Sequence, residues 1–564
     1  MRTYKTPNVY VEEVPTLPPS VVPVATAVPA FIGCTEKAGN NNEYRHQPIR
    51  ISSLLDYTSY FGGAYATSFK VDVAEDAQTK TTSITDISFA DGATATPKYL
   101  MYYALRMFFD NGGGPCYIVS IGDYSAKPDK KAFEDGLAAI RKEDEPTLLL
   151  LADGVNILST DYYSLCQGVL KQCTELQDRF AIFDVLASDK TTNGIGAEFR
   201  QGIGTSDLKY GAAYYPYLQT ALSTYYTDDS VVIEGLTAAD TQAPSTGSYN
   251  TGADGLLVTY SGPQSENPRI RIALTDRQSI AVEVVSGVLV IRLPEAGATV
   301  SEILAVSISN NSSEKYSLAG SGDDSTTIDT PLNETSLEYV SSAGTTLGDT
   351  SVKTDRTELY NQIKTALNAI RVVLPPSGAV AGVYAKVDRE RGVWKAPANV
   401  SLASVIGPTV KITNEEQDNL NVDATAGKSI NAIRSFTGKG TLIWGARTLA
   451  GNDNEWRYIS VRRLFNLIEE STQKATNFVV FESNTAITWL KVKTIIETYL
   501  EGLWRQGALA GDAPENAYFV NVGLGRTMTE QDILEGRMIV EIGIAAVRPA
   551  EFIVLRFSHK LQQA

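Results

Sequence analysis

The sequence is poor in the residues from which catalytic and metal sites are built. Its 564 residues include only two histidines, His46 and His559, and four cysteines. Two histidines this far apart exclude a multi-histidine metal cluster or an HExxH zinc site. The cysteines form no CxxC pair, and Cys166 and Cys173 lie on one face of an expected helix. We therefore expect reduced core cysteines and no metal, consistent with folding in a reducing cytoplasm.

Long apolar runs and a surplus of positive charge are missing as well. No run of about 18 apolar residues occurs, so no membrane span is expected. The residues from Met1 to Pro7 lack the apolar stretch of a secretory signal, and none is expected. The chain has 65 acidic against 49 basic residues, a net charge of −16. This balance argues against nucleic acid or an anionic membrane as the main partner.

Motifs for nucleotide binding and covalent catalysis are also absent. The sequence has no GxSxG and no GxGxxG string. The run from Ala426 to Ser429 ends like a phosphate-binding loop, but Val422 stands where that loop needs its first glycine. We therefore expect no nucleotide, no other cofactor and no enzyme. Asp153 and Asp184 follow expected strands and could serve a cryptic hydrolase; a helix-capping or loop role is the alternative.

The pattern of apolar and polar residues changes along the chain. Over 30–221, apolar runs of strand length alternate with helical patterns, which predicts a mixed or parallel sheet with flanking helices. Over 222–354, short alternating apolar runs are separated by Ser, Thr, Gly and Asp, which indicates an inserted all-β module. This segment holds 17 acidic and 6 basic residues, so most of the net charge belongs to it.

Helical patterns return after the acidic segment. Asp355, with Glu358 three positions on, predicts a capping box for a helix that ends near Ile370. A turn-rich stretch is expected next, and then helices over 460–472 and 485–506. The last helix has one apolar face and one charged face.

Both ends of the chain are predicted to be strands without a partner of their own. Residues 9–14 (VYVEEV) have strand propensity and precede five prolines between 15 and 29. Residues 551–557 (EFIVLRF) are apolar on nearly both faces. Such strands need a sheet supplied from elsewhere, with a frayed N-terminus as the alternative.

Several strings in fixed order resemble the contractile tail sheath family of phage tails and related contractile injection systems. They are YKTPNVYVEE (4–13), AVPAFIG (27–33), VYAKVDRERGVWKAPAN (383–399), SINAIR (429–434), WGARTL (444–449), WRYISVRR (456–463), LWRQGAL (503–509) and PAEFIV (549–554). The resemblance is dense over 372–564, moderate over 1–221 and absent over about 222–354.

The resemblance implies a structural subunit and not an enzyme. It implies six-membered rings that stack helically around an inner tube in a metastable extended state, and a contraction that drives the tube through a target envelope. It also implies that both arms pair as strands with sheets of neighbouring subunits. The residues concerned are Val9, Tyr10, Val11, Glu12, Phe552, Ile553, Val554 and Leu555. The proline-rich linker would then be a semi-rigid strap.

Partners and a tube-facing surface are implied in the same way. The partners are further copies of the chain, the inner tube protein, and baseplate and tail-terminator or cap proteins, with no direct nucleic acid contact. The C-terminal domain is implied to face the tube. Candidate contacts to the tube or between subunits are Arg434, Arg447, Arg457, Arg462, Arg463, Lys491, Lys493 and Arg505. Buried ion pairs within the subunit, or a solvated helix face over 485–506, are the alternatives.

The expected fold class is a multidomain α+β or α/β chain: a mixed-sheet sheath core with extended strand arms and an inserted all-β domain. The expected segments are the N-terminal arm and linker (1–29), an α/β sheath domain (30–221) with its return (355–400), the acidic outer insertion (222–354), a C-terminal α/β core domain (401–548) and the C-terminal arm (549–564). We expect assembly in the bacterial cytoplasm, and a place in a phage tail or a released injection particle. An adhesin module in 222–354 of a non-contractile surface assembly is the alternative function.

Overall fold

The computed structural model describes residues 21–75, 82–90, 92–187, 190–236, 246–251, 255–261, 266–310, 315–321, 324–339, 345–423 and 425–555. They belong to two compact units. The body unit comprises the residues up to Tyr65, then 95–223, and those from Arg371 onward. The inserted unit comprises 66–94 and 224–370. The insertion is therefore made of two separate stretches, whereas the sequence suggested the single segment 222–354.

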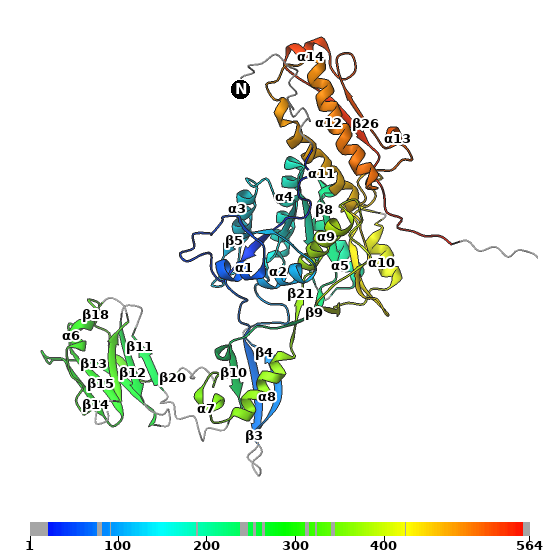
Figure 1. Ribbon diagram of the computed structural model, residues 1–564. Coiled ribbons are helices and arrows are strands. Elements are labelled where there is room, and N and C mark those ends of the chain that lie inside the picture. Colours follow the sequence, from blue (N-terminus) through cyan, green and yellow to red (C-terminus); the bar gives the residue numbers. More distant parts are fainter. Residues whose placement is uncertain are drawn as a thin grey trace, which may run out of the picture. The chain divides into compact units, whose positions relative to one another are not determined.

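A nine-stranded sheet forms the centre of the body unit (Figure 1). Its strands, in order, are β2 (Ile49–Ile51), β5 (Cys116–Gly122), β1 (Pro29–Cys34), β6 (Leu148–Leu151), β7 (Phe180–Asp184), β8 (Gly211–Tyr215), β24 (Asn431–Phe436), β25 (Gly440–Ile443) and β22 (Val400–Ser401). The strands from β5 to β24 run parallel, and the three outer strands pair antiparallel. Strands β1, β6, β7 and β8 are buried throughout, as continuous apolar runs predict. The predicted mixed sheet is confirmed.

Helices cover both faces of this sheet. On one face lie α3 (Lys130–Ile140), α4 (Ser159–Leu176) and α5 (Thr192–Gly202). On the other lie α1 (Leu54–Phe61), α2 (Met101–Asp110) and α9 (Ser377–Arg391). A small sheet of β21 (Arg371–Leu374), β9 (Leu218–Ser223) and β23 (Val405–Pro408), and helix α10 (Asn414–Asn421), complete this part. Residues 401–443 thus share a sheet with the α/β region, from which the sequence analysis had separated them.

Helix α9 stands where we expected a turn-rich stretch, and that prediction was wrong. Gly378 and Gly382 belong to this helix, and a Cβ at either position would collide with the backbone of α2, at Ala104 and Phe108. The two glycines therefore let the two helices approach closely. Because glycine lowers helix propensity, the same residues hid the helix in the sequence.

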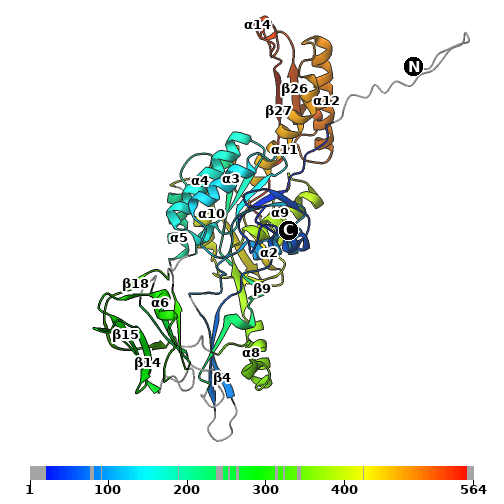
Figure 2. The ribbon, with the colours of Figure 1, turned by 90° about the vertical axis from the view of Figure 1, so that its left-hand side faces the viewer.

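The last part of the body unit has a core of its own. Helices α11 (Ile459–Thr476) and α12 (Ala486–Arg505), both predicted, pack with a hairpin of β26 (Tyr518–Val522) and β27 (Val540–Ile544). Figures 1 and 2 show α12 lying along this hairpin. Along the chain, the short helix α13 (Pro514–Ala517) directly precedes β26, and the short helix α14 (Glu530–Leu534) lies between β26 and β27.

The inserted unit contains a three-stranded sheet and an all-β module. The sheet pairs β10 (Val231–Glu234) with β3 (Phe69–Glu75), and β3 with β4 (Thr82–Phe89). This pairing explains why 66–94 belongs to the insertion. The helices α7 (Thr350–Lys353) and α8 (Thr357–Asn368) follow the module.

The predicted capping box of the helix after the acidic segment was wrong. The residue before α8 is Arg356, and no side chain caps the helix. Because α7 ends only at Lys353, the chain passes from one helix into the next without the extended residue that a cap requires. The Thr357 hydroxyl instead donates to the carbonyls of Lys353 and Thr354.

The all-β module consists of two four-stranded sheets that share one apolar core. One sheet contains β17 (Tyr316–Gly320), β12 (Leu256–Ser261), β11 (Thr246–Asn250) and β20 (Glu338–Tyr339). The other contains β14 (Ala281–Val285), β15 (Val288–Pro294), β13 (Arg269–Thr275) and β19 (Leu332–Ser336). The short strands β16 (Ala298–Thr299) and β18 (Thr327–Ile328) and helix α6 (Val300–Leu304) complete it. The apolar run over 282–292 is a hairpin, because Ser286 and Gly287, with φ of 52° and 82°, form a two-residue turn.

Candidate subunit-contact sites

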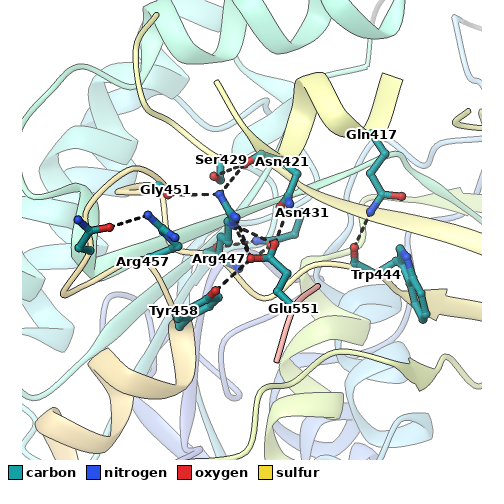
Figure 3. A network of polar contacts seen from close by, with 11 residues as sticks. Gln417, Asn421, Ser429, Asn431, Trp444, Arg447, Gly451, Arg457, Tyr458 and Glu551 are labelled. Atoms are coloured by element: carbon teal, nitrogen blue, oxygen red, sulfur yellow. Dashed lines mark hydrogen bonds and ion pairs between the residues drawn. The ribbon is translucent and has the colours of Figure 1, made fainter. Parts of the chain in front are cut away.

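The root of the C-terminal arm is fixed by an ion pair between Arg447 and Glu551 (Figure 3). The Arg447 guanidinium donates to both carboxylate oxygens, with Nε 2.9 Å from Oε1 and Nη2 2.7 Å from Oε2. The carboxylate also accepts from Asn421 Nδ2 at 2.7 Å and from the Tyr458 hydroxyl at 3.1 Å. Arg447 is therefore held in a fork that matches a carboxylate.

Further hydrogen bonds hold the buried Arg447 in place. The Arg447 side chain is 4% exposed, and its Nη1 also donates to the carbonyls of Asn421 and Gly451. Asn431 holds the Arg447 backbone from both sides, accepting from its N–H and donating to its carbonyl, each at 2.8 Å. Burial alone would raise the pKa of Glu551, but the bonds from Arg447, Asn421 and Tyr458 lower it overall.

The Arg447–Glu551 ion pair and its hydrogen-bond partners, called the anchor below, join residues that are far apart in the sequence. Asn431, Arg447, Tyr458 and Glu551 come from four of the strings that carried the family resemblance. The sequence analysis named only Arg447 among them, as a contact to another protein. The order of the strings was visible, but nothing in one sequence says that the strings meet in space.

Beyond Glu551 the described residues of the C-terminal arm form no helix or strand. Phe552, Ile553, Val554 and Leu555 are between 70% and 79% exposed and form no strand within the described residues. Four consecutive large apolar side chains in water are unfavourable, so they favour a partner that would cover them. Their role as an inter-subunit strand stays a prediction.

The N-terminal strand residues Val9, Tyr10, Val11 and Glu12 lie outside the described residues. The structure describes the proline-rich linker from residue 21 onward, and this part of the linker packs on α11. The Val24 N–H donates to the Ser471 hydroxyl, and Arg463 Nη2 donates to the Thr26 carbonyl at 2.7 Å. Val21 and Val24 also contact the apolar core around α11 and α12. The body unit therefore fixes the inner end of both arms.

The β26–β27 hairpin is a sheet of only two strands. Among the described residues, each strand pairs with the other and with no third strand, so one edge of each is open. A two-stranded sheet is marginal by itself, and unpaired edges accept added strands.

Three of the predicted contact cations are buried inside the subunit. Arg463 forms an ion pair with Asp388, Nη2 to Oδ2 at 2.5 Å, with both side chains at most 5% exposed. Arg462 is 2% exposed, donates to Asn466 and Glu469, and stacks on the Trp456 ring. Arg447 binds Glu551 as described. In the unassembled chain these three arginines thus form buried ion pairs within the subunit, which was the alternative to contacts with other proteins.

The other five cations are more accessible. Arg434 donates to Asn414 and Gln417, and Arg457 to Asn454. On α12, Lys493 lies 3.6 Å from Glu497 and Arg505 2.5 Å from Glu501, while Lys491 is exposed. Contact of any of these residues with a tube or another subunit stays a prediction.

The two strand-end aspartates bind helix termini. Asp184 accepts from the backbone N–H and the hydroxyl of Ser377, which begins α9. Asp153 accepts from the N–H groups of Leu100, which precedes α2, and of Cys34. Burial raises the pKa of Asp184 to about 7 and that of Asp153 to about 6. Both aspartates therefore have the helix-capping role that the sequence analysis gave as the alternative to catalysis.

At the other sites that the sequence suggested, the described residues form no arrangement suited to binding a phosphate or a metal ion. Lys428 is 4% exposed, and its ammonium group donates to the Arg200 carbonyl, so it faces protein and not a phosphate. All four cysteines are buried and unpaired. The described residues contain no group of three or more His, Cys, Asp or Glu side chains placed to hold a metal ion. No described helix combines the length and hydropathy that crossing a bilayer requires.

Comparison with known proteins points to phage tail sheath proteins. One family model, the phage tail sheath protein central domain, matches residues 293–449, and a second, the phage tail sheath C-terminal domain, matches residues 451–560. Two successive stretches of the chain are therefore similar to two successive domains of phage tail sheath proteins. The junction of the two models lies where the chain leaves the nine-stranded sheet and enters α11. The central-domain match begins inside 222–354, where we had found no resemblance; that expectation was wrong, because short strands carry no conspicuous strings.

Curated relatives and solved structures agree with this family. The tail sheath protein of Vibrio phage KVP40 is 25% identical over 185 residues, which cover 33% of this chain and 26% of that protein. The tail sheath protein of Burkholderia phage BcepMu is 33% identical over 156 residues, which cover 26% and 32%. The match thus spans no more than about a third of either relative's length.

The solved structures are similar over the whole chain. One is the sheath complex, in the contracted state, of the extracellular contractile injection system PVC: 27% identical, TM-score 0.54, covering 100% of this chain and 99% of that chain. Another is the helical sheath of the anti-feeding prophage in the contracted state: 28% identical, TM-score 0.53, covering 99% and 100%.

Proposed function

We propose that this tail sheath chain is the structural subunit of a contractile sheath that polymerises around an inner tube. The observation that carries the proposal is the combination, in one chain, of an exposed apolar arm with an anchored root and a two-stranded hairpin with open edges. An arm that forms no strand among the described residues, and a sheet with open edges, would be complementary when copies assemble. The full-length likeness to injection-system sheaths supports it.

Strand addition would link the copies through main-chain hydrogen bonds. Arms that are fixed at Glu551 and at residues 21–26 would keep subunits joined while the bodies move almost rigidly, as hinges do. Contraction would then release the energy of a metastable extended lattice without a nucleotide. We propose stacked six-membered rings, an inner tube, and baseplate and terminator proteins as further partners, in a phage tail or a released injection particle assembled in the bacterial cytoplasm.

Electron microscopy of the purified chain tests this proposal. Striated tubes of stacked rings are expected from the intact chain. Deletion of residues 1–20, or of 552–564, should abolish the tubes and leave a folded subunit, since the anchor at Glu551 remains. Intact tubes from either truncation would refute the arm model, and a monodisperse monomer from the intact chain would refute the sheath.

A proline scan separates main-chain from side-chain effects in the arm. Ile553→Pro removes one backbone N–H donor, whereas Ile553→Ala removes only side-chain contacts. If the arm adds to a sheet through its backbone, the proline variant should reduce tube formation more than the alanine variant. Equal effects would point to a side-chain contact instead.

A further inference from the structure

A groove on the body unit lies between α3 and α4, away from both arms in the sequence. Each helix lines it with positions i, i+3, i+4 and i+7: Glu134, Leu137, Ala138 and Arg141 from α3, and Gly168, Lys171, Gln172 and Glu175 from α4. This spacing places four residues along one stripe of each helix. The groove has a volume of about 290 Å³, and its elongated lining suits a helix or an extended segment.

Gly168 lies in the middle of the 18-residue helix α4 and packs closely against no described residue. A Cβ placed on it would meet no heavy atom within 4 Å, so no described neighbour requires a glycine there. Glycine inside a helix is less favourable than alanine. The residue therefore costs stability without serving the free subunit's own packing. Close approach of another backbone is a physical reason for a glycine in such a place.

Gln172, one helical turn further on, gives an independent indication. Its side chain is 6% exposed, and its amide nitrogen Nε2 has no hydrogen-bond partner among the described residues. A buried donor without an acceptor is unfavourable, and here water is also kept away from it. Gln172 also lines the groove, so a carbonyl of a docked chain is a possible acceptor for this amide.

The lining indicates the kind of partner. Its charges cancel, with Glu134 and Glu175 against Arg141 and Lys171, and Arg141 already binds Glu175 at 2.7 Å. A neutral groove does not attract nucleic acid or an anionic membrane. Its exposed centre, Ala138 and Gly168, admits close contact with a polypeptide.

We propose that the α3–α4 groove is an interface that receives a second copy of this chain in the assembled sheath. The inference rests on the proposed function, because only a polymer surrounds each body unit with further copies. It adds a contact between bodies to the links that the arms provide. A neutral, shape-dependent contact of this kind would be insensitive to salt.

The test uses a thiol at the centre of the groove. All four native cysteines are buried, so Gly168→Cys introduces the one readily reactive thiol of the folded, described chain. A maleimide should label this variant rapidly as a monomer and at least about tenfold more slowly in tubes, as contact at an interface core would give. Thr160→Cys, exposed on the same helix but outside the groove, should react in both states.

A second pair of variants tests the energetics. Gly168→Trp should leave the monomer's melting temperature unchanged or higher and raise the protein concentration needed for tubes by about tenfold or more. Gln172→Met, of similar size, should do the same because it removes the unpartnered amide. Thr160→Trp is the control that should change neither quantity.

The outcomes separate this inference from the proposed function. Tubes in which the Gly168→Cys thiol stays fully reactive, or normal tube formation by Gly168→Trp, overturn the groove interface and leave the sheath proposal intact. An unmodified chain that forms no polymer overturns both. If Gly168→Trp fails to fold, the protection of the Gly168→Cys thiol and the Gln172→Met variant decide.

Discussion

Replacing Glu551 by glutamine tests the anchor of the C-terminal arm most directly. The substitution keeps the shape of the side chain and removes its charge. It leaves Arg447, whose side chain is 4% exposed, without an anion among its neighbours at this site. The amide oxygen can still accept hydrogen bonds, but the NH₂ group replaces an oxygen that accepts from Arg447 and places a donor against donors.

The size of the effect follows from what is lost. The carboxylate accepts from Arg447, Asn421 and Tyr458. Hydrogen bonds to charged groups contribute about 1.5–3 kcal/mol, and breaking a buried ion pair costs about 3–5 kcal/mol. Because the Glu551 side chain is 20% exposed, we expect the lower range, about 2 kcal/mol for Glu551→Gln and about 3 kcal/mol for Glu551→Ala.

The effect depends on pH with a definite sign. The folded-state pKa of Glu551 is lowered, since the three donors outweigh burial. The anchor's stabilisation is therefore present above the pKa of the unfolded chain and is lost as pH falls through the folded value. The difference between native protein and Glu551→Gln should be full at neutral pH and should shrink in acid.

Limited proteolysis and urea unfolding of the unassembled subunit measure this effect. Glu551 lies at the edge of the fold, so its release should first expose residues near 545–551 to protease and then lower the unfolding midpoint. Glu541→Gln, an exposed carboxylate on β27, is the matched control and should change neither quantity. Equal protease sensitivity of Glu551→Gln and native protein at neutral pH would refute the anchor.

Three further predictions concern the rest of the fold. The raised pKa of Asp184, about 7, means that its stabilising contribution is fully present below the unfolded pKa of about 3.9 and is lost as pH rises to the folded value. Asp184→Asn, which can keep both bonds to Ser377, should flatten the fall in unfolding free energy between about pH 4 and 7, and a loss of stability at every pH would show that the charged form is needed. Burial raises the pKa of all four cysteines, so a thiol reagent should react with the folded subunit only in urea, and rapid labelling in buffer would contradict the packing. Replacing 246–339 by a short flexible linker should preserve the β10–β3–β4 sheet and tube formation, and unfolding would show that the module belongs to the core.

The sequence predicted those elements whose residues carry their own local signal. Apolar runs of strand length over 30–221 predicted a sheet where β1, β6 and β7 lie, and one-sided apolar spacing predicted α12. The elements that it missed depend on distant partners. Helix α9 contains glycines because α2 lies against it, and β3 joins the insertion because β10, about 160 residues later in the chain, pairs with it.

The candidate site likewise has one part that the sequence could predict and one part that it could not. That Phe552 to Leu555 favour a sheet supplied from elsewhere could be predicted from their composition, and they form no strand among the described residues. That Arg447 binds Glu551 could not, because an arginine in a conspicuous string has the same letters whether it faces a partner or a buried carboxylate. Burial decides between the two, and burial is a property of the fold.

The placement of the arginines changes which forces can hold the assembly together. Arg447, Arg462 and Arg463 are committed to the interior, and Arg505 and Lys493 have acidic neighbours on their own helix. Exposed pairs of that kind contribute little and weaken with salt. Under the proposed function, the exposed arm, the open hairpin edges and the neutral α3–α4 groove would then supply most of the cohesion. The first two would act through backbone hydrogen bonds, which do not depend on one arrangement of the bodies. Such a subunit would stay linked to its neighbours while its body contacts change, as the proposed contraction requires.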